Sequence, residues 1–595
     1  MHFMQTKYIP TKIVTLLLLF SVAIATFAPY AWARINTGSE WRGVTPELSY
    51  DAMYYYSRAN DVTRGHFFVT NPYYFEHRTE PAAISSVNDA IIALPQLLGL
   101  SFNFGYYANI FLWSIALLLL SYVLFRALAL SPLVSFFGTL WLYAGVYGGM
   151  LRPGSMQIIF PLYALFLLFF WRYLNKKDGN ASRSEPTKGA NLLRGIFPLA
   201  IITGLAPYFY IHLFIAIGAT LGVYALALLY WRRWADFRQI FFVGVFAVII
   251  VIPHAIHGLS LASQPFYWEA LAHNAFTYSH WPQIEAYYYG RWIVLVLSLV
   301  YILRRYYPEK ITQTTHFFVL FTGLGLLLAM VSNIFTGRDF EIAVHVARFS
   351  IFWYLVVGVV VLKPVYLFVF HLRGAWLKRA IALLLFVLLF YQMIANLNRS
   401  TAHFSQMKES FVEAQTYAGI LDFLKREPES VVLAPEDLNS YISTLTKQYV
   451  LYNRYGAHFS VSIDENQERY LLYRAFDRLT ESEFIEKGQE HYGPTPSYLA
   501  RTSALRHRLC SLVRIIGNCP APETERSFID SAAMEKKFES YYPDLISRIE
   551  EEYARYHVRY IVSKTSASHP LLGTPSCLIV YRDQWFEACQ LRNGN

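Results

Sequence analysis

Residues 46–100 read PELSYDAMYYYSRANDVTRGHFFVTNPYYFEHRTEPAAISSVNDAIIALPQLLGL and form the first long polar interval of the chain. Asp51 opens a Tyr- and Arg-rich segment, and a second polar group follows around Glu76 and His77. Apolar runs flank this interval and recur to about residue 396. A run of about 18 or more apolar residues is long enough to cross a bilayer. We therefore expect the interval to lie on the surface of a membrane.

The composition excludes an ordinary soluble enzyme. Of the 595 residues, 55% are hydrophobic and only 15% are charged, whereas about 25% are charged in typical soluble domains. The net charge of +10 does not indicate nucleic-acid binding, because much of it lies in short loops between apolar runs. We predict a polytopic helical membrane domain at 1–396 and a polar α/β domain at 397–595.

Eleven membrane spans are expected. They lie near residues 13–32, 105–127, 131–150, 156–174, 194–207, 209–231, 239–257, 291–304, 313–334, 346–368 and 378–396. We place a turn at Pro207 and Tyr208, between the fifth and sixth spans. The eighth span is short and is expected to extend backwards through 287–289.

Lys and Arg residues orient these spans. They precede the first span and fill the loops after the fourth, sixth, eighth and tenth. Since cytoplasmic loops carry the excess of positive charge, the N-terminus is predicted to be cytoplasmic. This places 33–104, 150–155, 258–290, 335–345 and 397–595 outside. The sequence Ala31-Trp32-Ala33 resembles a signal-peptide cleavage site; an uncleaved anchor is favoured, and either alternative leaves the next loop outside.

All four cysteines fall in the C-terminal domain, at Cys510, Cys519, Cys577 and Cys589. An even set confined to one compartment is typical of an oxidising environment and predicts disulfides. Pairing of neighbours, Cys510 with Cys519 and Cys577 with Cys589, is the simplest of three connectivities. Zinc is the rival interpretation, but the spacings fit no common zinc motif.

The C-terminal domain shows the pattern of a mixed α/β fold. Short apolar segments at 430–434, 448–452, 558–562 and 577–581 are expected to be strands, and residues 405–426 and 464–489 are expected to be helical. The domain contains no glycine-rich nucleotide-binding motif.

The polar interval itself predicts two short helices lying in the membrane interface. Ser49 is a suitable N-cap for a helix that starts at residue 50 or 51 and ends near Gly65. That helix brings Asp51, Tyr54, Tyr55, Arg58 and Asp61 onto one broad face. Residues 86–100 form the second helix, which is too short to span. Arg58 has an alternative role as an ion-pair partner of Asp51 or Asp61.

Transfer of a sugar from a polyprenyl phosphate needs three things: a carboxylate to activate the acceptor, cations to hold the departing phosphate, and a groove for the lipid. Asp51 is the candidate carboxylate, and Arg58, Arg152 and Arg348 are candidate phosphate ligands. Tyr55 belongs to a tyrosine run that suits either the membrane interface or a sugar ring.

The segment SYDAMYYYSRANDVTRG, followed by NPYYFEH, resembles the outer loop of the GT-C superfamily of membrane glycosyltransferases. This superfamily includes bacterial aminoarabinose transferases, protein O-mannosyltransferases and oligosaccharyltransferases. The resemblance implies that Asp51 is the essential acid and that Glu76 or His77 has a second polar role. It extends to the turn around Arg152 and to TGRDFE at 336–341. The latter contains Arg338 and leads to His345 and Arg348, a region where related enzymes contact the donor phosphate.

The resemblance implies a glycosyltransferase of a bacterial inner membrane. The donor is expected to be a polyprenyl-phosphate sugar, and the acceptor a hydroxyl of a glycan, lipid or protein. A divalent cation, Mg²⁺ or Mn²⁺, stays open, because some members of the superfamily use one and others do not. The alternatives are a lipid-linked oligosaccharide polymerase or ligase, a transporter or flippase, and an inactive scaffold.

The sequence also predicts a geometry. Asp51 should lie in a cavity formed by the outer ends of spans three, four and ten, close to Arg152 and Arg348. The outer loop 258–290, which contains Trp268, Glu269 and His273, is expected to shape the acceptor site, or else to be a plain aromatic interfacial loop.

Overall fold

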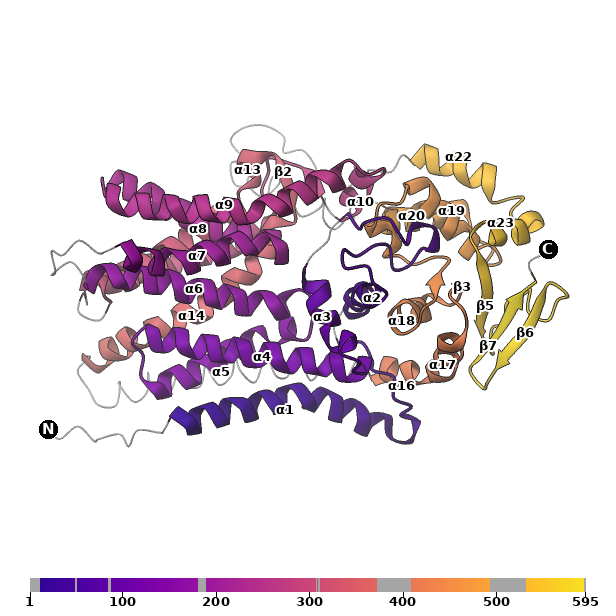
Figure 1. The fold of residues 1–595 in the computed structure, drawn as a ribbon, viewed down its shortest axis with the longest axis horizontal. Helices are drawn as coiled ribbons and strands as arrows, with labels where there is room; N and C mark the ends of the chain where they lie inside the picture. Colours follow the sequence, from indigo (N-terminus) through magenta and orange to yellow (C-terminus); the bar gives the residue numbers. More distant parts are fainter. Residues whose placement is uncertain are drawn as a thin grey trace, which may run out of the picture.

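The computed structural model of this chain describes residues 11–48, 51–83, 87–179, 189–274, 276–306, 308, 311–371, 408–492 and 531–592. Long helices run side by side in one bundle, and a smaller α/β domain packs against one end of it (Figure 1). Two short helices, α2 and α3, lie at this end, which we call the outer end. The fold is therefore a polytopic helical membrane domain with an α/β domain, as predicted.

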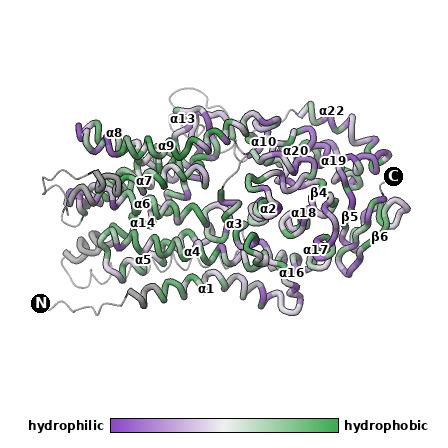
Figure 2. The backbone as a smooth tube through the Cα atoms, in the orientation of Figure 1, coloured by the Kyte–Doolittle hydropathy of each residue, from purple (hydrophilic) through white to green (hydrophobic). Residues whose placement is uncertain are grey.

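The described part of the bundle consists of ten helices. They are α1 (Thr11–Thr37), α4 (Phe102–Ala127), α5 (Pro132–Met150), α6 (Met156–Gly179), α7 (Gly189–Phe209), α8 (Ile211–Tyr230), α9 (Trp234–Ala262), α11 (Ile284–Tyr306), α12 (Gln313–Met330) and α14 (Ile342–His371). Hydrophobic residues dominate them, whereas the α/β domain is mostly hydrophilic (Figure 2). In the apolar window of α6, 78% of residues are buried, against 17% in α9. The helix α6 is therefore central, and α9 lies at the surface of the bundle.

Eight of the described helices are long and apolar enough to cross a membrane. They match predicted spans two to four and six to ten, and α11 does extend backwards as expected. The total of eleven is not confirmed: α1, which covers the first predicted span, is not among the eight, the apolar part of α7 covers only Ile196–Phe209, and the span at 378–396 lies outside the described residues. The predicted boundary between the two domains, at residues 396–397, lies outside them too.

Two predicted boundaries were wrong. Pro207 lies inside α7, and the break before α8 falls at Tyr210, whose backbone is extended at φ −166° and ψ 115°. Pro207 costs α7 one backbone hydrogen bond but does not end the helix, which also contains Pro198. The expected span at 313–334 stops at Met330 and is followed by the short helix α13 (Asn333–Thr336).

The polar interval forms α2 (Ala52–Thr63), the 3-10 turn η2 (Phe75–His77) and α3 (Val87–Leu97). Gly65, at φ +103°, follows the end of α2 as predicted. The place of α2 in the membrane interface stays a prediction. Most of α2 is buried, because its small residues, including Ala52, Ser57 and Ala59, permit close packing against α3 and the α/β domain.

The α/β domain is built on a five-stranded sheet in the order β4-β3-β5-β7-β6. Strands β3 (Val431–Leu433), β4 (Tyr449–Val450) and β5 (Val558–Lys564) are parallel neighbours, and β7 (Phe586–Leu591) and β6 (Cys577–Arg582) extend the sheet antiparallel. The four predicted strands are present, and β7 was missed. The predicted helices divide in two, since α16 (Lys408–Thr416) is followed by α17 (Ala418–Arg426), and α19 (Ile463–Tyr473) by α20 (Glu481–Tyr492). The described helices of the domain also include α18 (Glu436–Leu445), α22 (Ser531–Tyr541) and α23 (Ile549–Arg555).

The described cysteines confirm part of the disulfide prediction. Cys577 and Cys589 are bonded to each other across strands β6 and β7. Cys510 and Cys519 lie outside the described residues, so their pairing stays a prediction.

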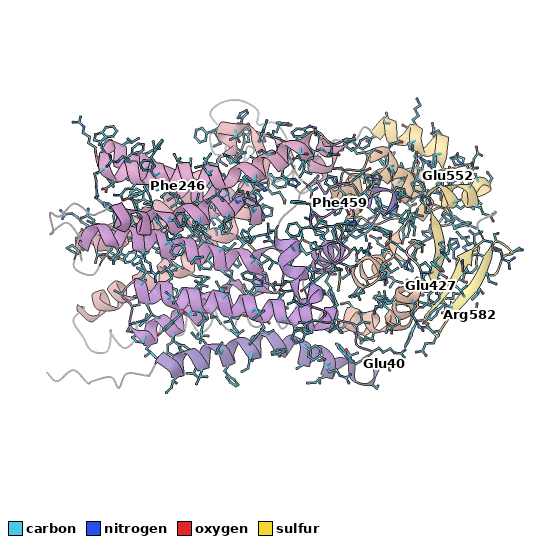
Figure 3. The ribbon with its side chains drawn as sticks, viewed as in Figure 1. Glu40, Phe246, Glu427, Phe459, Glu552 and Arg582 are labelled. Carbon is cyan, nitrogen blue, oxygen red and sulfur yellow. A yellow bond between two sulfur atoms is a disulfide. The ribbon has the colours of Figure 1, made fainter. Side chains whose placement is uncertain are left out.

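The α/β domain is joined tightly to the polar interval. At strand β4, the Val450 N–H donates to the carbonyl of Tyr73, a residue of the polar interval, at 2.8 Å. The Thr444 hydroxyl donates to the carbonyl of Met53 in α2 at 3.1 Å. Phe459, labelled in Figure 3, is buried at this junction and packs on Tyr73. The domain therefore fixes the position of α2.

Candidate active site

Asp51 is the N-cap residue of α2 and has a left-handed backbone, with φ 69°. The prediction that it lies on the face of the helix was therefore wrong, because the chain turns sharply just before α2. Non-glycine residues adopt this conformation at a cost and concentrate at functional sites. The Asp51 side chain is only 16% exposed, so it does not point into open solvent.

Two long-range contacts hold the Asp51 carboxylate. The Arg152 guanidinium donates to Oδ2 at 2.6 Å, and the Tyr455 hydroxyl donates to Oδ1 at 3.1 Å. Arg152 lies in the turn between α5 and α6, and Tyr455 belongs to the α/β domain. The expected proximity of Asp51 and Arg152 is thus present, and the α/β domain contributes a third group that the sequence did not reveal.

The turn that contains Arg152 packs closely against α2 and α3. Gly154 has φ +66°, and a Cβ atom there would lie 2.7 Å from Ile92 and 2.9 Å from Tyr55. The Asn88 amide donates to the Gly154 carbonyl at 2.7 Å. Arg152 also lies 5.5 Å from the centre of the Tyr55 ring. Tyr55 and Asp51 raise the pKa of Arg152, so the guanidinium is a permanent cation.

A second polar group lies at the outer end of the bundle, and it contains a carboxylate as well as a cation, because Oε2 of Glu341 lies 3.4 Å from Nε2 of His345. The Tyr210 hydroxyl, in the break between α7 and α8, forms a hydrogen bond with Nδ1 of His345 in α14. His212 stacks on His345 with ring centres 4.3 Å apart. One turn along α14, Arg348 has a buried Nη1 atom with no hydrogen-bond partner in the described part of the chain.

Tyr210 connects this polar group to Arg152. Burial raises the pKa of Tyr210, and the Arg348 and Arg152 guanidinium groups both oppose that rise. Tyr210 is therefore within electrostatic reach of both. The structure brings Asp51, Tyr55, Arg152, His345 and Arg348 to one region, which we call the Asp51 cluster. Guanidinium groups with free N–H donors are well suited to phosphate oxygens.

Within the described part of the chain, Arg58 forms its ion pair with Asp89, and no ion pair joins it to Asp51 or Asp61. Its Nε and Nη2 atoms donate to the two oxygens of Asp89 in α3, at 3.1 and 2.8 Å, and its Nη1 atom donates to the Tyr54 hydroxyl at 3.1 Å. The side chains of Arg58 and Asp89 are 6% and 2% exposed. This geometry joins α2 to α3 and favours a structural role, while the predicted phosphate contact stays a prediction.

Glu76 and His77 contact the α/β domain. Arg469 of α19 is buried and forms an ion pair with Glu76 at 2.5 Å. His77 lies between Glu80, 2.7 Å from Nδ1, and Glu465, 2.9 Å from Nε2. Burial lowers the pKa of His77, but hydrogen bonds and charge from the two carboxylates outweigh burial and raise it. These residues hold the domain in place, and the structure brings neither of them to Asp51.

Arg338 lies in a small separate sheet, in which β2 (Arg338–Phe340) pairs with β1 (Phe276–Tyr278). Its side chain is exposed and lines a surface pocket with His280 and Trp281. Within the described part of the chain, no ion pair joins it to the Asp51 cluster.

Sequence reasoning missed several groups around Asp51. Glu47 accepts a hydrogen bond from the Met53 N–H at 3.1 Å, and burial raises the pKa of its carboxyl. Arg454 donates to the Tyr455 hydroxyl at 3.0 Å. Tyr210 fell within the predicted span 209–231 and was given no role. Nothing in the spacing of residues 454 and 455 points to Asp51, which lies 404 positions before Tyr455.

The described residues contain one group of three carboxylates close enough to share a metal ion, Glu481, Glu535 and Glu539. These acids belong to α20 and α22 of the α/β domain, and none of them is part of the Asp51 cluster. The question of a divalent cation at Asp51 therefore stays open.

No family model matches this chain, and no curated protein matches it. Its structure resembles two solved structures of ArnT from Cupriavidus metallidurans, one bound to undecaprenyl phosphate and one in the apo state. The identities are 11% and 12%, the TM-scores are 0.42 and 0.40, and each comparison covers 97% of both chains.

Proposed function

We propose that this protein is a membrane glycosyltransferase that moves a sugar from a polyprenyl-phosphate donor to an acceptor hydroxyl. The observation that carries the proposal is the Asp51 cluster. In it a largely buried carboxylate is paired with Arg152, and Tyr210, which is hydrogen-bonded to His345, interacts with both Arg152 and Arg348 at the outer end of a lipid-embedded bundle. The cluster supplies a base and a phosphate site, which are two of the three requirements of this reaction, and the groove for the lipid is part of the proposal.

Asp51 acts as the general base. The acceptor oxygen attacks the anomeric carbon and forms a new C–O bond, while the bond between that carbon and the phosphate oxygen breaks. The acceptor proton passes to the Asp51 carboxylate, and the electron pair leaves with the polyprenyl phosphate. The single displacement inverts the anomeric configuration.

Arg152, His345 and Arg348 bind the phosphate and stabilise the charge that develops on it. In the structure Arg152 is bonded to Asp51, which would weaken the carboxylate as a base. A phosphate that enters the cluster competes for the Arg152 guanidinium. Donor binding would thus release Asp51 for proton transfer.

The proposal is tested in cells that lack the protein and are complemented with wild type or with Asp51→Asn. Envelope glycans and polyprenyl-linked lipids are both measured by mass spectrometry. We expect the Asn variant to insert normally, to lack one sugar in an envelope glycan, and to accumulate the polyprenyl-linked form of that sugar. Asp422→Asn, which changes an exposed carboxylate of α17, is the matched control.

The outcomes separate the rival functions. Unchanged glycans and lipids in the Asn variant contradict the catalytic proposal. If the glycan loses the sugar in cells without the protein but keeps it with the Asn variant, a transporter or a scaffold is supported instead.

A further inference from the structure

The carboxylate of Asp51 does not cap its own helix. An N-cap residue ordinarily has an extended backbone, and its side chain accepts a hydrogen bond from the N–H of the second or third helical residue. Asp51 is the N-cap residue of α2, yet its backbone is left-handed, with φ 69° and ψ 7°, and its side chain makes no such bond. Another group must therefore satisfy the first N–H groups of α2.

That group is the side chain of Glu47, which precedes Asp51 in the same segment. Its Oε1 atom accepts a hydrogen bond from the N–H of Met53, the second residue of α2, at 3.1 Å. Burial raises the pKa of Glu47, and the N–H groups of Met53 and Ala52 oppose that rise, as expected for a carboxylate at a helix N-terminus. Glu47 thus makes the bond that Asp51 would make at an ordinary helix start.

The segment that contains Glu47 is held by both domains. The Leu48 N–H donates to the hydroxyl of Tyr106 in α4 at 3.2 Å. The hydroxyl of Tyr441 in α18 forms a hydrogen bond with the backbone of Glu47. The bundle and the α/β domain therefore fix Glu47 at the start of α2.

Glu47 and Asp51 also interact with neighbouring residues of the α/β domain. Arg454 interacts electrostatically with Glu47. The Arg454 guanidinium donates to the Tyr455 hydroxyl at 3.0 Å, and that hydroxyl donates to Asp51 at 3.1 Å. A change at Glu47 would therefore affect Asp51 both through α2 and through Tyr455.

Loss of the Glu47 carboxylate would leave Asp51 to cap α2. Aspartate is among the strongest N-cap residues, and it caps with an extended backbone. A backbone of lower energy and a hydrogen bond from the Met53 N–H would then draw the Asp51 carboxylate away from Arg152 and Tyr455. The left-handed backbone of Asp51 is thus stable only while another side chain caps the helix.

We propose that Glu47 is a positioning residue, which caps α2 in place of Asp51 and so keeps the Asp51 carboxylate on Arg152 and Tyr455. This inference rests on the proposed function, because the group that Glu47 positions is the proposed base. Glu47 itself has no role in proton transfer.

The kinetic test uses the full-length protein in nanodiscs. The donor is the lipid that accumulates in Asp51→Asn cells, and the acceptor is an envelope fraction from cells that lack the protein. Glu47→Ala should lower kcat about tenfold, which is the effect of one helix cap on the two positions of Asp51. The donor KM should not rise, because Arg152 stays available to the phosphate.

Two further variants separate positioning from general stability. Glu47→Gln keeps an oxygen that can accept from the Met53 N–H, so its kcat should stay within about twofold of the wild-type value. Thr312→Ala is the matched control: the Thr312 hydroxyl caps α12 by accepting from the Thr315 N–H at 3.1 Å, outside the Asp51 cluster. Loss of this cap should lower the stability of the protein and leave kcat unchanged.

A double variant and a structure test whether Glu47 acts through Asp51. Glu47→Ala combined with Asp51→Asn should transfer no more slowly than Asp51→Asn alone, because the group that Glu47 positions is then already absent. A cryo-electron-microscopy structure of Glu47→Ala measures the position of Asp51 without catalysis. We expect its carboxylate on the Met53 N–H and no longer on Arg152.

Four outcomes overturn the inference: Asp51 still bonded to Arg152 in that structure, a wild-type kcat in Glu47→Ala, an equal loss of kcat in Glu47→Gln or Thr312→Ala, or a full further loss in the double variant. If Asp51→Asn itself transfers sugar at the wild-type rate, the proposed function fails. A displaced Asp51 carboxylate in the Glu47→Ala structure would even then show that Glu47 holds it in place.

Discussion

Replacing Asp89 by Asn should loosen the attachment of α2 to α3. Asp89 neutralises Arg58 through two hydrogen bonds, at 3.1 and 2.8 Å, and the two side chains are 6% and 2% exposed. Loss of one partner from a buried pair leaves an uncompensated charge and costs about 3–5 kcal/mol. Because Asp51 is the N-cap residue of α2, the same change should disturb the Asp51 cluster.

The loss of local stability is measured on protein in nanodiscs, by hydrogen exchange of the peptides that cover α2 and α3. If these helices open locally, a cost of about 3–5 kcal/mol lowers their amide protection by about two to three and a half powers of ten. Asp422→Asn breaks an exposed pair with Lys425, which is worth less than about 1 kcal/mol, and should leave protection nearly unchanged. The reasoning is refuted if Asp89→Asn keeps the wild-type protection.

A double variant separates the two roles of Arg58. Replacing Arg58 by Met and Asp89 by Leu removes both charges together, so we expect protection of α2 to recover substantially. If sugar transfer also recovers, Arg58 is structural. If protection recovers and transfer does not, Arg58 contacts the phosphate.

Three other changes test the structure around the site. His77 has a raised pKa in the fold, so its stabilising contribution is complete below its unfolded pKa of about 6.5 and is lost as pH rises through the folded value. The rate of proteolysis at the junction between the polar interval and the α/β domain should therefore increase above that pH in wild type. In His77→Gln, this rate should not depend on pH. Gly154→Ala places a Cβ atom 2.7 Å from Ile92 at a residue with φ +66°. We expect this change to displace Arg152 and to lower the rate of sugar transfer. The control is Gly148→Ala, where a Cβ atom meets nothing within 4 Å and the rate should fall less. Cys577→Ser removes the disulfide to Cys589, 12 positions away, and should destabilise the α/β domain by about 3 kcal/mol. We expect a lower Tm, and a Tm equal to that of wild type would show that the bond adds no stability.

The bundle was predictable because its signal is local. Runs such as 105–127 and 346–368 are long enough to span by themselves, and the loops rich in Lys and Arg alternate with polar outer loops. The same local logic predicted strands at 430–434 and 558–562 and the pairing of Cys577 with Cys589. It failed where a boundary depends on packing, as at Pro207, which α7 tolerates close to its end.

The candidate site was predictable only in part. Arg348 was chosen because an ionisable group that enters an apolar span is costly and tends to be functional. Asp51 and Arg152 were chosen for the chemistry of the reaction and for the resemblance to the GT-C outer loops. The contacts of the site residues were not predictable. The Tyr455 hydroxyl, from the α/β domain, donates to Asp51, and Arg58 forms its ion pair with Asp89 instead of with Asp51 or Asp61. No periodicity encodes such contacts, since they depend on how α2 packs against α3 and α18.

The most direct test of the central claim is the rate of sugar transfer by purified protein, with the lipid that accumulates in Asp51→Asn cells supplied as donor. Removal of a general base lowers a rate by about 10²–10⁴-fold. We therefore expect a loss of this size in Asp51→Asn, with unchanged insertion and Tm. Transfer by that variant at the wild-type rate would show that Asp51 is not the base and would contradict the account.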